Sequence, residues 1–588
     1  MPLWLIPTAW AARGTPLGTP FADDFDFLHF SLLRGNPSWF DGGGGGLYWR
    51  PLARQLDYGL LGPVMLEHPA MIAVLHGLAL ALAGLALYAA VRHALGRPAA
   101  ACAAATPLLL DGSRLVLAWP SCAQELGALL MLALALLSVA RRQWVLAALA
   151  AAAAVLCKET AAAAVPLLAL APLPALAPRR RRGVVLMAAF GLLGVWWTVH
   201  RWVEAHAGQF PISVVAPPEA ASTSAAARIV WSLMRAFRDT LNVDLLSVGL
   251  QRFFVAAALV LVAAAAGAAL LDRAANQRLA RRLPWILWGL AWFALTAAPS
   301  ASLYPAWASY RSLLPALGLG VALTAMLAAL PVYALAPLVA LRLAALIVAP
   351  GAPTRVAEGW SDFGAAFDFP RLARVQRFVA ETHRVLAEDR RSLPRGAMLA
   401  KHAWPRMTEY AFAGGKAFQV WYRDTTLRWV SFEKFRLDRS LPVSVILEYQ
   451  PLRRSPISCL SPEAMRELLN AVDRLQAGEY QQGLERLAAA ERLEPDTSNA
   501  VFLASVDSRR ALAFEALGRS ADAAAAAARA FARYPDDPDA RVVLARAAER
   551  RGDRRLAARL LEEHLLRYPG DATARERLEA LGRASSSR

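Results

Sequence analysis

The chain has 588 residues, a hydrophobic fraction of 57% and a formal net charge of +18. The hydrophobic fraction exceeds that of typical soluble domains, and the excess is confined to about residues 69–350. Basic residues form short clusters between apolar runs or alternate with acids, so the charge does not indicate nucleic acid binding, and the four cysteines show no disulfide or metal-ligand spacing.

The first distinctive segment is FADDFDFLHF, in which Asp23, Asp24 and Asp26 fall within four positions. Carboxylates are costly to place beside membrane spans, and they therefore indicate a reaction or a ligand at the membrane surface; an ordinary polar loop is the alternative. An aspartate here could act as general base for an attacking hydroxyl, or it could hold a divalent cation through its oxygens. The sequence leaves these two roles open.

The acids belong to an expected first outer loop, residues 14–68. This loop also holds a glycine run from Gly42 to Gly46, which permits mobility or close backbone approach. Aromatic residues after the run could lie at the lipid headgroup level or stack on a sugar ring, while Arg50 and Arg54 could bind a lipid phosphate.

Ten apolar segments of spanning character follow, and they predict a polytopic helical bundle over residues 1–350. They lie near 69–92, 98–110, 115–140, 143–157, 160–177, 183–203, 249–271, 283–300, 311–330 and 331–350. Arginine clusters mark every second connection, which the positive-inside rule assigns to the cytoplasm. The first loop and everything after residue 350 are then expected outside, in a multi-pass protein of the bacterial inner membrane.

Residues 351–460 predict a small extracytoplasmic α+β module. RLARVQRFVAETHRVLAE has the apolar spacing of an amphipathic helix, whereas AFQVWYRDTTLRWVSF and LPVSVILEY have the composition of strands.

Residues 461–583 carry a repeat, ahead of an expected disordered tail at 584–588. Three glycines are each followed seventeen residues later by a proline: Gly478 and Pro495, Gly518 and Pro535, Gly552 and Pro569. This spacing resembles tetratricopeptide repeats, an α-solenoid that binds a peptide or protein surface, with generic helical hairpins as the alternative.

Several stretches in order resemble the GT-C membrane glycosyltransferases, most closely a branch similar to protein O-mannosyltransferases that carries such repeats. They are FADDFDFL, LYWRPLARQLDYGLLG, LAWPSCAQELGALLMLALAL, LCKETAAAAVPLLAL and SYRSLLPALGLGVAL. The resemblance implies a bundle of about eleven spans and transfer of a sugar, with inversion, from a polyprenyl-phosphate donor to a protein or glycan acceptor. It implies catalysis by Asp23 or Asp24, donor-phosphate binding by Arg50, Lys158 and Arg311, and support from Asp26, Glu159 and Arg114.

The chain also departs from that family. Asp111 and Arg114 stand where relatives carry a His-Pro and an acid, and Ser309 and Tyr310, not a glutamate, precede Arg311. These departures indicate divergent specificity or a weakened enzyme. Lys158 and Glu159 could equally be an ion pair at an outer face. The alternative functions are a non-catalytic scaffold whose repeats organise envelope proteins and, less favoured because repeated halves are absent, a transporter.

Overall fold

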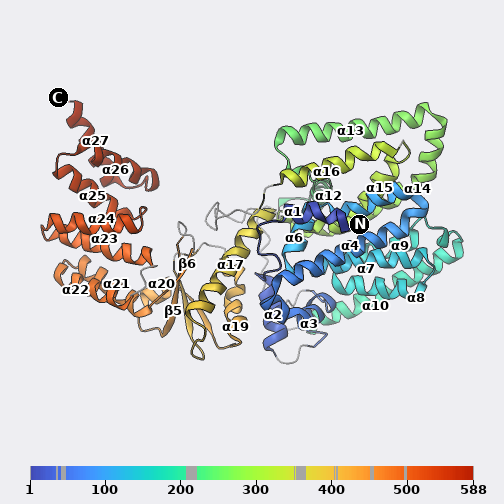
Figure 1. Cartoon of the computed structure of the whole chain (residues 1–588). Coiled ribbons are helices and arrows are strands. Elements are labelled where there is room, and N and C mark those ends of the chain that lie inside the picture. Colours follow the sequence, from blue (N-terminus) through green and yellow to red (C-terminus); the bar gives the residue numbers. More distant parts are fainter. Residues whose placement is uncertain are drawn as a thin grey trace. The chain divides into compact units, whose positions relative to one another are not determined.

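A computed structural model describes residues 2–34, 38–41, 48–206, 222–330, 332–349, 351, 366–402, 404, 408–450, 456–494 and 499–586 (Figure 1). The chain is mainly helical. It forms two compact units, of which the first comprises residues 1–380 together with 405–425 and the second comprises 381–404 and 426–588. The expected glycine run 42–46 and Pro495 lie outside the described residues.

The first unit contains helices with the length and composition of membrane spans. Five qualify among the described residues: Pro69–Leu95 (α4), Pro120–Ala140 (η4 and α7), Arg179–His206 (α10), Arg273–Leu303 (α14 and η8) and Ser309–Leu327 (η9 and α15). A sixth is formed if the bent pair α5 (Arg97–Leu108) and α6 (Asp111–Ala118) is one span. These helices are compatible with a multi-pass membrane protein.

The described residues thus show part of the expected ten or eleven spans, and four further apolar stretches are shorter than a full span. These are Trp144–Cys157 (α8), Glu159–Leu170 (η5 and α9), Leu259–Ala268 within α13 (Val248–Leu271), and Ala336–Val348 (α16). The first two are separated at Lys158, whose backbone is extended, with φ −154° and ψ 127°. The break between these two helices thus falls between the predicted segments 143–157 and 160–177, at Lys158.

The bend between α5 and α6, at 54°, frees backbone carbonyls that a straight helix would satisfy. Four side chains donate to four consecutive carbonyls: Arg342 Nη2 to Thr106 O (2.5 Å), Ser113 Oγ to Pro107 O (2.5 Å), Thr8 Oγ1 to Leu108 O (2.6 Å) and Asn242 Nδ2 to Leu109 O (2.7 Å). Three of these donors come from distant segments, namely α1 (Leu5–Ala11), the turn after α12 (Ala225–Thr240) and α16. Their hydrogen bonds offset the cost of exposing a broken helix to an apolar environment.

Helices α14 and α15 cross with almost no space between their backbones. A Cβ on Gly289 would lie 2.5 Å from Gly318 O, and a Cβ on Gly318 would lie 2.6 Å from Gly289 O. Trp292 Nε1 of α14 donates to Leu314 O of α15 at 3.0 Å. Small residues at this crossing set the distance between two elements that both contribute to the cavity described below.

The first outer loop folds into α2 (Asp23–Leu33), the π-helical turn η3 (Leu52–Leu56) and α3 (Asp57–Glu67). A segment from much later in the chain, containing α18 (Thr408–Ala411), η11 (Ala413–Gly415) and α19 (Lys416–Tyr422), packs against α2 within the same unit. AFQVWY is therefore helical, and the strand prediction for it was wrong. Gly415, at φ 101°, directly precedes α19 and Arg423, at φ 51°, directly follows it, so local turn geometry outweighs the β propensity of the aromatic residues.

The second unit combines a small mixed sheet with helical hairpins. The sheet order is β4 (Arg428–Ser431), β3 (Met398–His402), β5 (Val443–Tyr449) and β6 (Ile457–Leu460), and only the β5–β6 pair is antiparallel. The strands expected in LRWVSF and LPVSVILEY are confirmed as β4 and β5. The expected amphipathic helix forms α17 (Phe369–Asp389), whose first half belongs to the first unit.

Seven helices follow α20 (Phe432–Leu437) in sequence order: α21 (Pro462–Gln476), α22 (Tyr480–Leu493), α23 (Ala500–Ala516), α24 (Ser520–Arg533), α25 (Pro538–Arg550), α26 (Arg554–Arg567) and α27 (Ala572–Ser586). Gly478, Gly518 and Gly552 have φ of 81°, 74° and 81°, the left-handed conformation that ends a helix. Hairpins at the predicted positions are therefore present, while their assignment to the tetratricopeptide class stays a prediction. Helix α27 continues through Ser586, into the range expected to be a tail.

Candidate functional site

The predicted acids occupy the first turn of α2, where the positive end of the helix dipole stabilises carboxylates. Asp23 and Asp26 are three residues apart and share a face of the helix, whereas Asp24 points to another side. This spacing divides the three acids into a pair that lines a cavity and one that is fully buried elsewhere.

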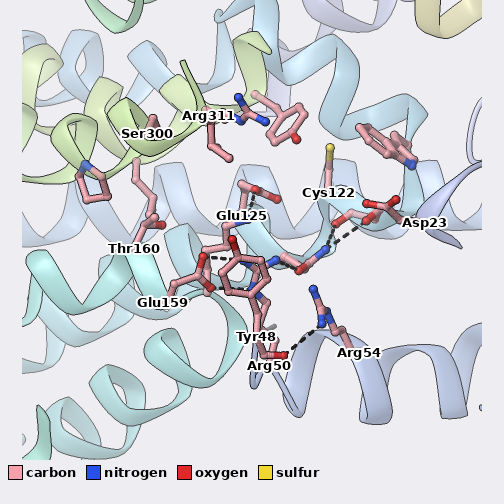
Figure 2. Close-up of a pocket in the computed structure, with 18 of the residues that line it drawn as sticks. Asp23, Tyr48, Arg50, Arg54, Cys122, Glu125, Glu159, Thr160, Ser300 and Arg311 are labelled. Carbon is pink, nitrogen blue, oxygen red and sulfur yellow. Dashed lines mark hydrogen bonds and ion pairs between the residues drawn. The ribbon is translucent and has the colours of Figure 1, made fainter. Parts of the chain in front are cut away.

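The cavity has a volume of about 370 Å³ and collects most of the residues that the sequence singled out (Figure 2). Its wall includes six of the eight predicted site residues: Asp23, Asp26, Arg50, Lys158, Glu159 and Arg311. Trp119, Gln124, Glu125 and Tyr310 also line it, together with Ser300 and Leu303 of η8. Segments spread over about three hundred residues thus meet at one polar cavity between apolar helices.

Two ion pairs form the wall opposite Arg311. The Arg50 guanidinium donates to Glu159 through Nε at 2.6 Å and Nη2 at 2.5 Å, and it also donates to the Gln124 carboxamide. Lys158 Nζ lies 2.7 Å from Glu125 Oε1. Burial opposes ionisation of Glu159, but Arg50 and Lys158 together lower its pKa below the ordinary range. Lys158 and Glu159 therefore do not pair with one another, and each cation is balanced by a carboxylate of another segment.

Arg311 differs from these paired cations. Among the described residues no carboxylate lies within 4 Å of its guanidinium, which donates to Ala306 O at 2.8 Å and lies 5.7 Å from the ring of Tyr310. Arg54 approaches the cavity from η3, where it donates to Tyr48 O and lies 4.6 Å from the ring of Phe27. Burial and the neighbouring Arg50 lower the pKa of Arg54 to about 9.

The side-chain carboxyl of Asp23 faces the cavity, and it makes no hydrogen bond or ion pair within the described part of the chain. Burial and the charge of Asp26 raise its pKa above the ordinary value, while Arg54, Arg50 and Lys158 oppose that rise. A carboxyl group with a raised pKa and an open face is suited to exchange a proton with a bound hydroxyl.

Asp24 lies outside the cavity wall and is completely buried. Its Oδ1 accepts from Tyr58 OH at 2.5 Å, and its Oδ2 accepts from Phe21 N at 2.8 Å and Trp119 Nε1 at 3.0 Å. Burial raises its pKa to about 8 even though the three donors act in the opposite direction. Its geometry is that of a group that holds α2, α3 and Trp119 together.

Arg114 also lies away from the cavity. It is buried, pairs with Asp111 three residues earlier and lies 4.4 Å from the ring of Phe369. The Asp111 and Arg114 pair that departs from the family pattern is therefore an internal contact of α6, not part of the cavity wall.

No protein-family model, curated protein or solved structure matches the chain. The sequence resemblance therefore stands on its motifs, and the function has to be argued from the cavity.

Sequence reasoning missed the functional candidates Gln124, Glu125, Tyr310 and Lys416. Lys416 pairs with Asp26 in the same unit and directly precedes a segment that was predicted to be a strand. One signal was present: the chain has only four lysines against sixty arginines, and Lys158 and Lys416 are two of the four.

The metal alternative receives no further support from the geometry. No group of three or more His, Cys, Asp or Glu side chains that could hold a metal ion occurs in the described ranges. Asp23 and Asp26 would supply only two carboxylates to a cation, and Asp26 already pairs with Lys416.

Proposed function

We propose that this protein is an integral membrane glycosyltransferase that uses a polyprenyl-phosphate-linked sugar and a hydroxyl acceptor. The observation that carries the proposal is the placement of Asp23, with no ion-pair partner in the described part of the chain, and Arg311 on the wall of one cavity among apolar helices. The reaction removes a proton from the acceptor oxygen and adds negative charge to the donor phosphate. An acid on this wall can take the proton, and a cation can stabilise the phosphate.

In the proposed reaction, the Asp23 carboxylate takes the proton of the acceptor hydroxyl as its oxygen attacks the anomeric carbon. The bond between that carbon and the phosphate oxygen breaks, and the electron pair leaves with the phosphate. Arg311 and Arg54 stabilise the additional negative charge. Arg50 and Lys158 were predicted to bind the phosphate directly, but their ion pairs indicate that they shape the wall and contribute less net charge.

The outward orientation of the loop and of the helical repeats is part of the same proposal. It would place the cavity on the face where lipid-linked sugars meet proteins or glycans, with the repeats recruiting a protein partner. The support is the alternation of arginine clusters along the sequence.

The test is sugar transfer by the purified protein in lipid nanodiscs, with radiolabelled polyprenyl-phosphate hexoses as donors. Asp23→Asn should reduce transfer by about 10²- to 10⁴-fold, the usual contribution of a general base. Asp57→Asn is a matched control, because Asp57 is a half-buried acid of the neighbouring helix that does not line the cavity. Full activity in Asp23→Asn would refute the assignment, and absence of both donor binding and transfer in the wild-type protein would favour the scaffold alternative.

A further inference from the structure

The helix turn that carries the acids is contacted by a segment that lies far along the chain from the cavity residues. Residues 405–425 lie between β3 and β4 in the sequence, yet they belong to the first unit. Ala22 N, directly before α2, donates to Ala411 O at 2.8 Å, and the Trp421 ring meets the Phe25 ring edge-on at 5.5 Å. This segment therefore holds the turn of α2 that carries the acids.

Within that segment, Lys416 forms an ion pair with Asp26 Oδ1, and both side chains are partly exposed. Lys416 is the first residue of α19, where the helix dipole disfavours a cation. Its position is therefore not explained by the stability of its own helix. In a chain that uses arginine at sixty of sixty-four basic positions, a compact ammonium group at this point is a second indication of a specific contact.

We infer that Lys416 is a positioning residue for the cavity. Lys416 neutralises Asp26, so that Asp23 is the carboxylate on this face of α2 that receives the proton of the acceptor hydroxyl. The inference rests on the proposed function, and it assigns the later segment a direct part in the site. Without Lys416, two carboxylates three residues apart on one face would compete for a proton.

The groups around Asp23 determine the sign of the expected effect. They are Asp24 and Asp26 on α2, Arg50 and Arg54 beside and within η3, Tyr58 on α3, Cys122 on η4, Glu125 on α7, Lys158 and Glu159 before and within η5, Tyr310 and Arg311 on η9, Tyr410 on α18 and Lys416 on α19. His29 of α2 interacts with both Asp26 and Lys416. Removing the Lys416 charge exposes Asp23 to the full repulsion of Asp26. The midpoint of Asp23 ionisation should then move upward by about one pH unit, because the carboxylates of Asp23 and Asp26 are several ångströms apart near a protein surface.

The experiment measures this midpoint without requiring a substrate. Full-length protein in nanodiscs is treated with a carbodiimide across a pH series, and modification of Asp23 is followed by peptide mass spectrometry. Lys416→Met should raise the midpoint, and Lys416→Arg should return it toward the wild-type value. Lys434→Met, which removes an exposed lysine from α20, should leave it unchanged.

A double variant separates the charge effect from misfolding of the segment. Asp26→Asn combined with Lys416→Met removes both charges, and the midpoint should fall back to the wild-type value or below it. A midpoint that does not move in Lys416→Met, or that stays raised in the double variant, would overturn the inference. If the midpoints behave as expected while no donor is transferred by the wild-type protein, the proposed function fails and the role of Lys416 in setting Asp23 stands.

Discussion

The buried carboxyl of Asp24 provides the sharpest prediction about what holds this site together. Asp24→Ala removes the acceptor of Tyr58 OH, Phe21 N and Trp119 Nε1 at once. Each buried donor left without a partner costs about 1–3 kcal/mol. Because effects above about 5 kcal/mol are exceptional for one substitution, we expect a loss of about 3–5 kcal/mol in the free energy of unfolding.

Asp24→Asn is the matched variant. Its carboxamide oxygen can still accept from Phe21 N and Trp119 Nε1, and its amide group can donate to the Tyr58 oxygen, so each of the three contacts keeps a hydrogen bond. A carboxyl whose burial raises its pKa to about 8 is neutral at pH 7, so the asparagine should cost less than about 1 kcal/mol. If Asp24 were the catalytic base, as one of the two initial hypotheses holds, the same variant would lose transfer activity while remaining folded.

The assay is equilibrium unfolding of detergent-solubilised protein, followed by labelling of Cys122 and Cys157, two buried thiols of the first unit. Wild-type stability in Asp24→Ala would refute the structural role, and so would an Asn variant as unstable as the Ala variant. Stable Asn protein without transfer activity would return Asp24 to the catalytic role.

Three further predictions concern pH, helix packing and the buried ion pairs. The folded protein holds a proton on Asp24 up to about pH 8, whereas the unfolded chain releases it near pH 4. The free energy of unfolding should therefore fall as pH rises between these values. In Asp24→Asn, the free energy of unfolding measured across pH 5–9 should change less steeply with pH. Gly318→Ala places a methyl group against Gly289 O and should lower the free energy of unfolding by about 1–3 kcal/mol, measured by thermal unfolding. Gly191→Ala is the control: nothing lies within 4 Å of its Cβ, so it should not destabilise α10. Glu125→Gln leaves Lys158 buried without its carboxylate and should lower the free energy of unfolding by about 3–5 kcal/mol. Most of this loss should be recovered in the double variant with Lys158→Met. A single variant as stable as the wild-type protein would contradict the buried ion pair.

The sequence was most informative where a single residue type limits the chemistry. Three acids in four positions indicated the helix that lines the cavity, and the resemblance to GT-C glycosyltransferases pointed to Arg50, Lys158 and Arg311, which lie on three distant segments of its wall. Such residues are expensive inside an apolar bundle, so their presence signals a site even before the fold is known.

Other features depend on contacts that no local pattern contains. Asp24 cannot be told from Asp23 in the sequence, because its role is set by Tyr58 and Trp119, which come from other elements. Lys416 could not be placed because the residues that follow it have strand-like composition, yet they form a helix with Lys416 between two residues of positive φ. Beyond the long helices among the described residues the number of spans stays a prediction, because hydropathy marks apolar stretches and does not fix the length of the helix that each one forms.

The bend between α5 and α6 has a consequence for how the chain is assembled. Its carbonyls at 106–109 are exposed as soon as this segment enters the membrane, but two of the four donors that satisfy them, Asn242 and Arg342, are synthesised only later. An unsatisfied carbonyl in hydrocarbon costs several kcal/mol, so the early helices must wait in water, in the translocation machinery or in a strained state. The helix α16, although short, thus supplies the last of the four donors to be synthesised.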